Sequence, residues 1–138
     1  MAAARQETIF MPESQEDIVG YGREDVIAMA ALLLNGTKRW MILSDKRIES
    51  WEAATDQDEP VAVMETAKIT KAVADIHAED PSLYVEAGDD KWTIVVYSKE
   101  GRATHDEKSK ELFRWMAGLK KKGGVHVDEK PAEADSAV

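Results

Sequence analysis

Residues 26–51 read VIAMAALLLNGTKRWMILSDKRIESW, and this stretch decides the fold. Three apolar segments are separated by two short polar turns, Asn35-Gly36 and Ser44-Asp45. Asn-Gly is the strongest short hairpin signal, because a type I′ turn needs positive φ at both central residues. Serine and aspartate side chains bond to nearby backbone and so favour turns. The stretch therefore predicts an antiparallel meander with strands at 25–34, 38–43 and 47–52.

More strands are predicted after the acidic loop at 53–60. Residues 61–64 form a short apolar run, and the apolar runs 83–87 and 91–98 flank Gly88-Asp89-Asp90, which is typical of another hairpin. Residues 68–77 fit both helical and strand spacing. We favour a strand there, paired with the next segment, and leave the helix open as the alternative.

A helix is predicted near the C-terminus. Thr104 and Glu107 have the spacing of a capping box. Positions that recur at i, i+3, i+4 and i+7 place one apolar face on this helix, which Phe113 widens; they are Leu112, Trp115, Met116 and Leu119. The lysines at 120–122 complement the helix dipole, and Gly123 ends the helix. The predicted class is α+β: a strongly bent antiparallel sheet or partly open barrel of six or seven strands, capped by this C-terminal helix.

The chain is predicted to have one folded unit between two polar ends. Residues 1–22 are polar and are interpreted as a leader that is flexible or loosely docked. Residues 23–122 form the domain. Residues 123–138, GGVHVDEKPAEADSAV, are small, acidic and contain proline. Such a composition buries too little apolar surface to offset its ordering entropy, which predicts a disordered acidic tail.

Composition narrows the function classes. The net charge is −9, which disfavours non-specific binding to nucleic acid or anionic lipid, although 31–51 carries +2 and 91–122 carries +5. The absence of cysteine excludes disulfides, thiol catalysis and thiolate metal sites. The longest apolar run, 26–34, is far shorter than the roughly 20 residues of a transmembrane helix. We therefore expect a cytoplasmic protein without a transmembrane segment.

Two phrases carry a resemblance to a known family. Residues 41–48, Met-Ile-Leu-Ser-Asp-Lys-Arg-Ile, combine an apolar strand, a Ser-Asp turn, two basic residues and a second apolar strand. With the helix phrase SKELFRWMAGLK at 109–120, this resembles bacterial pleckstrin-homology-like (PH/GRAM-like) domains over residues 18–122. It departs from them at 69–78, where the family has a distinct strand. The resemblance implies a barrel plugged by the helix, and a binding module that presents a phosphoinositide pocket, a peptide groove or a dimerisation surface.

The resemblance also gives candidate ligand-binding residues. Basic side chains on the first two strands hold headgroup phosphates in lipid-binding members, and the matching residues here are Lys38, Arg39, Lys46 and Arg47. Neighbours on a strand point to opposite faces, so at most one of Lys38 and Arg39 faces any given pocket.

No motif points to an enzyme or to a cofactor. The histidines at 77, 105 and 126 share no metal-ligand spacing, and the acidic residues cluster in loops where carboxylates are usually solvated. There is no glycine-rich phosphate loop and no nucleophile elbow. We therefore expect no catalytic residues, no metal and no cofactor.

The function expected is that of a non-catalytic interaction module or adaptor. It would bind a protein partner or itself, as a homo-oligomer, through a sheet edge or the helix–sheet groove. The first alternative is a membrane-surface domain that reads anionic lipid headgroups. The second is a single-stranded nucleic-acid-binding protein that uses basic and aromatic residues on a sheet face, which the negative charge makes the less favoured reading.

Overall fold

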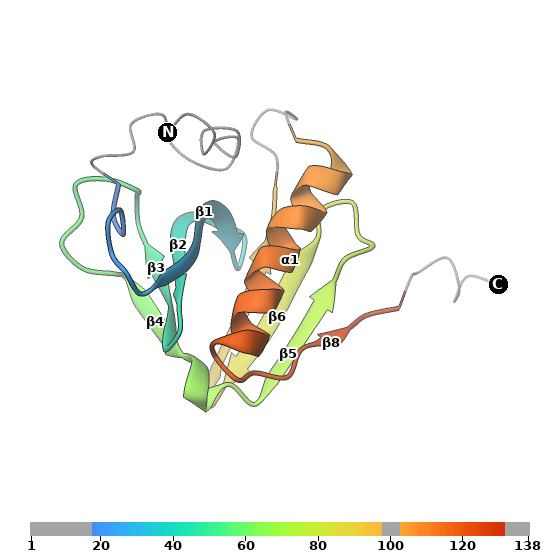
Figure 1. Ribbon diagram of the computed structural model, residues 1–138. Coiled ribbons are helices and arrows are strands. Elements are labelled where there is room, and N and C mark those ends of the chain that lie inside the picture. The colour runs from blue at the N-terminus through green and yellow to red at the C-terminus, as the bar shows by residue number, and fades with distance from the viewer. Residues whose placement is uncertain (1–17, 98–102, 132–138) are drawn as a thin grey trace.

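The computed structural model describes residues 18–97 and 103–131 (Figure 1). In this part of the chain, one open sheet has the strand order β4-β3-β2-β1-β7-β6-β5-β8. One α-helix packs across this sheet. The elements are β1 (Val26–Leu34), β2 (Thr37–Ser44), β3 (Arg47–Trp51), β4 (Ala62–Glu65), the 3₁₀ turn η2 (Thr66–Lys68), β5 (Lys71–Asp75), β6 (Ser82–Ala87), β7 (Asp90–Val95), α1 (His105–Lys121) and β8 (Asp128–Glu129).

The predicted α+β class, a bent antiparallel sheet capped by a C-terminal helix, is confirmed. All neighbouring strands are antiparallel except β8, which runs parallel to β5. The segment at 68–77 contains the favoured strand, because β5 pairs with β6 along its length. The strand count differs from six or seven, because the two-residue β8 makes the described sheet eight-stranded. The sheet does not close, so β4 and β8 are its two edges.

The turns behave as their residues predict. Asn35 and Gly36 have φ of 51° and 87°, the two positive values of a type I′ turn. Asn35 also accepts a hydrogen bond from the Thr93 backbone amide at 2.8 Å, which ties this hairpin to β7. In the next turn, the Ser44 hydroxyl accepts from the Arg47 amide at 3.3 Å. Local side-chain chemistry therefore sets the register of the first three strands.

The helix α1 lies across one face of the sheet and closes the main core (Figure 1). The Thr104–Glu107 capping box is present in both directions, as predicted. Gly118 is the point of closest approach, since a Cβ there would lie 2.8 Å from both Ile27 and Leu43. The predicted apolar face is buried, but Phe113 is 44% exposed. Phe113 does not widen the buried face, because it projects to the solvent side of the helix.

The structure describes part of each predicted chain end, and the C-terminal part differs from the prediction. Val125 and Val127 are 7% and 5% exposed and belong to the main core. The tail predicted at 123–138 is therefore packed at Val125 and Val127 and pairs with β5 as far as Lys130, and residues 132–138 lie outside the described part. At the other end, Ile18 is 4% exposed and the Val19 amide is bonded to Ala54, so the start of 18–22 is docked, which is one of the two alternatives predicted for the leader. Residues 1–17 of the predicted leader lie outside the described part.

Candidate functional site

The segment that precedes β1, residues 18–25, covers the face of β1–β3 opposite to the helix. A second apolar cluster forms there, and its buried members are Ile18, Trp40, Ile42 and Trp51. The Trp40 indole donates to the Val19 carbonyl at 2.9 Å, and the Val19 amide donates to the Ala54 carbonyl at 2.7 Å. Gly20 has φ of 96° and lies against Ile42, where a Cβ would come within 2.8 Å. The covering segment is therefore fixed by its backbone as well as by its side chains.

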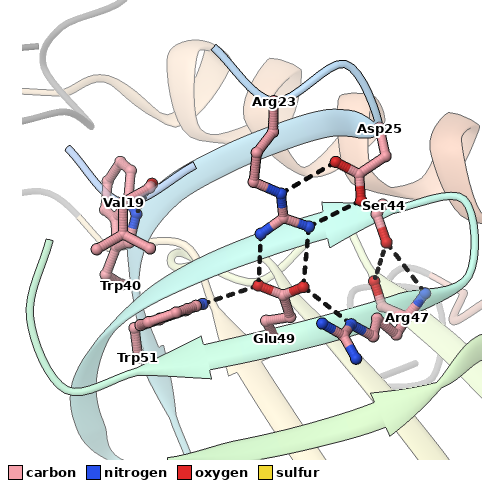
Figure 2. Close-up of polar contacts among 8 residues, drawn as sticks. All are labelled: Val19, Arg23, Asp25, Trp40, Ser44, Arg47, Glu49 and Trp51. Carbon is pink, nitrogen blue, oxygen red and sulfur yellow. Dashed lines mark hydrogen bonds and ion pairs between the residues drawn. The ribbon is translucent and has the colours of Figure 1, made fainter. Parts of the chain in front are cut away.

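A buried carboxylate, Glu49 on β3, stands at the centre of this face (Figure 2). Its side chain is 0% exposed. Arg23 donates from Nη1 to Oε1 at 2.9 Å and from Nη2 to Oε2 at 3.0 Å. The Trp51 indole donates to Oε1 and the Arg47 Nε donates to Oε2, each at 2.9 Å. Each oxygen of Glu49 thus accepts two hydrogen bonds. Arg23 extends the network by a further hydrogen bond to Asp25 at 2.8 Å.

The network fixes the charges of its members. Burial alone would raise the pKa of Glu49, but the hydrogen bonds from Arg23, Trp51 and Arg47 outweigh it and leave the pKa below its usual range. The hydrogen bonds to Asp25 and then Glu49 raise the pKa of Arg23. A carboxylate with a lowered pKa and four donors is a poor general base, because it has neither a free lone pair nor affinity for a proton. Glu49 therefore holds the covering segment in place.

The four predicted ligand-binding residues do not meet in one pocket. Lys38 and Arg39 lie at the start of β2, whereas Lys46 and Arg47 lie in and beyond the turn after β2. The eight residues of β2 separate these ends by about 23 Å at roughly 3.3 Å per residue. Lys38 lies 5.9 Å from the Tyr97 ring centroid, and Arg47 is bound to Glu49. The second pair borders a hollow.

That hollow opens beside β4 and has a volume of about 540 Å³. Its lining is Asp25, Ser44, Asp45, Lys46, Arg47, Val63 and Glu65. Two cations face three carboxylates, so the hollow is not a concentrated positive site of the kind that holds phosphate groups.

The strand β4 borders this hollow and is an edge strand of the sheet. No segment of the described chain pairs with its outer side. The Thr66 amide donates to the Lys46 carbonyl on the β3 side, and backbone groups alternate along a strand, so Val63 and Glu65 direct their amides and carbonyls outward. Val61 and Val63 are 52% and 36% exposed. The opposite edge, β8, is only two residues long and is followed shortly by Pro131, which blunts it.

The tryptophans and histidines considered in the sequence analysis form no binding or metal site in the described part of the chain. All four tryptophans are buried, so none of them exposes its ring to solvent for stacking on a base; they are Trp40, Trp51, Trp92 and Trp115. His105 contacts the Ala78 carbonyl and His126 contacts Asp128, and the described residues hold no cluster of three potential metal ligands. The helix in the described part is too short and too polar to cross a bilayer.

Sequence reasoning missed the Glu49 network, although part of its signal was visible. Residues 47, 49 and 51 alternate along a strand and so share one face. The partner Arg23 carries no comparable signal, because it lies 26 residues away in the polar segment before β1. The sequence matches no protein-family model and no curated protein. The geometry of β4 and its surroundings therefore carries the functional argument.

Proposed function

We propose that this chain is a non-catalytic, PH-like interaction module that binds a protein partner, or a second copy of itself, by strand addition at β4. The observation that carries this proposal is the outer edge of β4, with the backbone groups of Val63 and Glu65 directed away from the sheet. An added strand would satisfy these groups and gain affinity without a recognisable sequence motif. Proteins commonly protect such edges, and here the described chain leaves it open.

The side chains around the edge support the same reading. Val61 and Val63 offer exposed apolar surface beside the backbone donors and acceptors. The hollow lined by Lys46, Arg47 and Glu65 would accept an alternate side chain of the added strand. The second surface expected from the sequence, a groove between helix and sheet, is less suitable because Gly118 packs directly against Ile27 and Leu43.

The alternatives are less well supported. Anionic headgroups and single-stranded nucleic acids both need cations gathered on one face. The candidate cations are divided between the two ends of β2, and the tryptophans that could stack on bases are buried. The lack of cysteine in the whole sequence fits a reducing compartment such as the cytoplasm.

A single substitution at the edge tests the proposal. Val63→Pro removes an outward-facing donor and obstructs an added strand, while the bonds from β4 to β3 remain, as proline is tolerated on edge strands. Affinity purification from extracts of the source cells should recover proteins, or further copies of the chain, with the wild type but not with Val63→Pro. Phe113→Ser, an exposed apolar site on the helix, is the matched control and should behave as the wild type. Equal recovery with Val63→Pro, at unchanged circular dichroism, would contradict strand addition at β4.

A second measurement separates the alternatives. Phosphate-dominated binding weakens steeply with salt, because each neutralised phosphate releases counterions. We expect no co-sedimentation with anionic liposomes and no gel shift with single-stranded RNA or DNA at physiological salt. Micromolar binding in either assay, abolished by charge reversal at Lys38, Arg39, Lys46 and Arg47, would replace this proposal by the corresponding alternative.

A further inference from the structure

The two ends of the β4 edge differ in charge. Every charged residue between 52 and 61, on the approach to β4, is acidic: Glu52, Asp56, Asp58 and Glu59. These residues line a second hollow that ends at Val61. The cations that border β4 lie at its other end, with Lys46 in the adjoining turn, Arg47 at the start of β3 and Lys68 in η2. The edge is therefore purely acidic at its N-terminal end and of mixed charge at its C-terminal end, where Asp45 and Glu65 lie among the cations and Lys68 is 3.7 Å from Glu65.

Such an edge is complementary to itself only in one orientation. If two copies paired in parallel, the acidic loop of one would lie against the acidic loop of the other, and like charges would repel. In the antiparallel orientation, the acidic approach of each copy faces the C-terminal end of β4 in the other, where Lys68 follows the strand. Opposite charges on neighbouring strands stabilise pairing.

The backbone selects a register within that orientation. Val63 and Glu65 direct their hydrogen-bonding groups outward, as derived above from the Thr66–Lys46 bond. A two-fold axis at Met64 puts Val63 of each copy opposite Glu65 of the other. Both pairs are then of the hydrogen-bonded type, in which the two residues exchange both of their bonds. The same register brings Lys68 next to Pro60 and Glu59 of the second copy.

We propose that the occupant of the β4 edge is a second copy of this chain, paired antiparallel about a two-fold axis at Met64 so that the sheets of the two copies become continuous. The proposal rests on the proposed function, since it needs strand addition at β4. It adds the identity of the partner and the register. The short edge predicts a weak dimer, with a dissociation constant in roughly the micromolar to millimolar range.

An exchange of charges between copies tests the pairing. Sedimentation equilibrium of the wild type should show a mass that rises from one to two copies with concentration. Lys68→Glu alone and Glu59→Lys alone should each weaken the dimer about tenfold, because two like-charge contacts replace two opposite-charge contacts in the symmetric pair. An equimolar mixture of the two variants should restore dimerisation, since both contacts in the mixed dimer have opposite charges. A mixture that stays as weak as the separate variants would overturn the antiparallel pairing.

Cysteine cross-linking tests the register, because the natural sequence has no cysteine. Directly opposed residues in a hydrogen-bonded pair have Cα atoms about 5.5 Å apart, within disulfide range. Mixing Val63→Cys with Glu65→Cys under mild oxidation should therefore give mixed disulfide dimers in preference to Val63→Cys homodimers. A preference for the Val63→Cys homodimer would overturn the axis at Met64.

The outcomes also separate this inference from the proposed function. A wild-type chain that stays monomeric up to about 1 mM overturns the second copy as partner. If other proteins are then recovered with the wild type but not with Val63→Pro, strand addition is still supported, with another protein as the occupant. A monomeric wild type together with equal protein recovery by the wild type and Val63→Pro would overturn both proposals.

Discussion

Arg23 and Glu49 are joined by two parallel hydrogen bonds, of 2.9 and 3.0 Å, between a segment that precedes the sheet and the middle of β3 (Figure 2). The guanidinium is 31% exposed and the carboxylate is 0% exposed. A fork-to-fork pair of this kind fixes orientation as well as distance. It holds the segment 18–25 over Trp40 and Trp51, so that the second apolar cluster is closed by a charged contact.

The first prediction concerns this pair. Arg23→Ala should lower the free energy of unfolding by about 2 kcal/mol, because two hydrogen bonds to a charged group are lost while Arg47 and Trp51 remain. Glu49→Gln should cost about 3 kcal/mol, because it leaves Arg47 without its counter-charge and Arg23 with Asp25 as its only carboxylate partner. Urea denaturation of both variants and of the double variant gives the coupling energy.

The expected double variant is less destabilised than the sum of the single variants by at least about 1 kcal/mol, as residues in one network usually are. Asp25→Asn is the control for the exposed arm of the network. Its ion pair with Arg23 has a 47% exposed carboxylate, so the cost should be below about 1 kcal/mol. Strict additivity of Arg23→Ala and Glu49→Gln would show that the bidentate contact contributes nothing of its own.

The second prediction follows from the pKa of Glu49, which is lower in the folded chain than its usual value. Such a group stabilises the folded state above its unfolded pKa of about 4.3, and this contribution is lost as pH falls through the folded value. The free energy of unfolding should therefore decrease as the pH is lowered below about 5. Glu49→Gln and Arg23→Ala should both flatten this slope in urea titrations between pH 7 and pH 3. An unchanged slope in Glu49→Gln would assign the acid sensitivity to other carboxyls.

The fold was largely predictable because its elements carry local signals. Asn35-Gly36 specifies a turn by backbone conformation, and Thr104 with Glu107 specifies a helix start by reciprocal hydrogen bonds. The site was not predictable in the same way. The contact between Arg23 and Glu49 depends on how the segment before β1 folds back over the sheet, which no local pattern records.

The C-terminal segment failed as a prediction for a different reason. Its composition is polar on average, and averaging concealed the alternation of Val125 and Val127 with polar neighbours. Two valines at period two are sufficient to continue a strand-like path against the core, and β8 then pairs with β5. Long-range packing, rather than local propensity, orders this segment.

The third prediction tests that segment. A chain truncated after Gly124 loses Val125 and Val127, which are 7% and 5% exposed. Burying a valine is worth about 1.5 kcal/mol or more, so the truncation should cost about 3 kcal/mol and lower Tm by roughly 10 °C. The reference is a chain truncated after Pro131, which keeps all described residues of the segment. Equal Tm values for the two truncations would show that the valines do not contribute to the core.

The fourth prediction separates the two aromatic residues of the helix. Trp115 is 1% exposed and its indole donates to Glu111 at 3.1 Å, whereas Phe113, two residues earlier, is 44% exposed. Trp115→Ala should cost about 3–5 kcal/mol, since it leaves a cavity between helix and sheet and removes the hydrogen bond to Glu111. Phe113→Ala should stay within about 0.5 kcal/mol of the wild type, as exposed substitutions usually do. Thermal denaturation followed at the helix signal in circular dichroism measures both.

Because typical domains have about 5–15 kcal/mol of stability, Trp115→Ala should be close to unfolding at 37 °C. A Trp115→Ala chain as stable as Phe113→Ala would show that the helix is held to the sheet by its other contacts, such as Gly118 against Ile27 and Leu43.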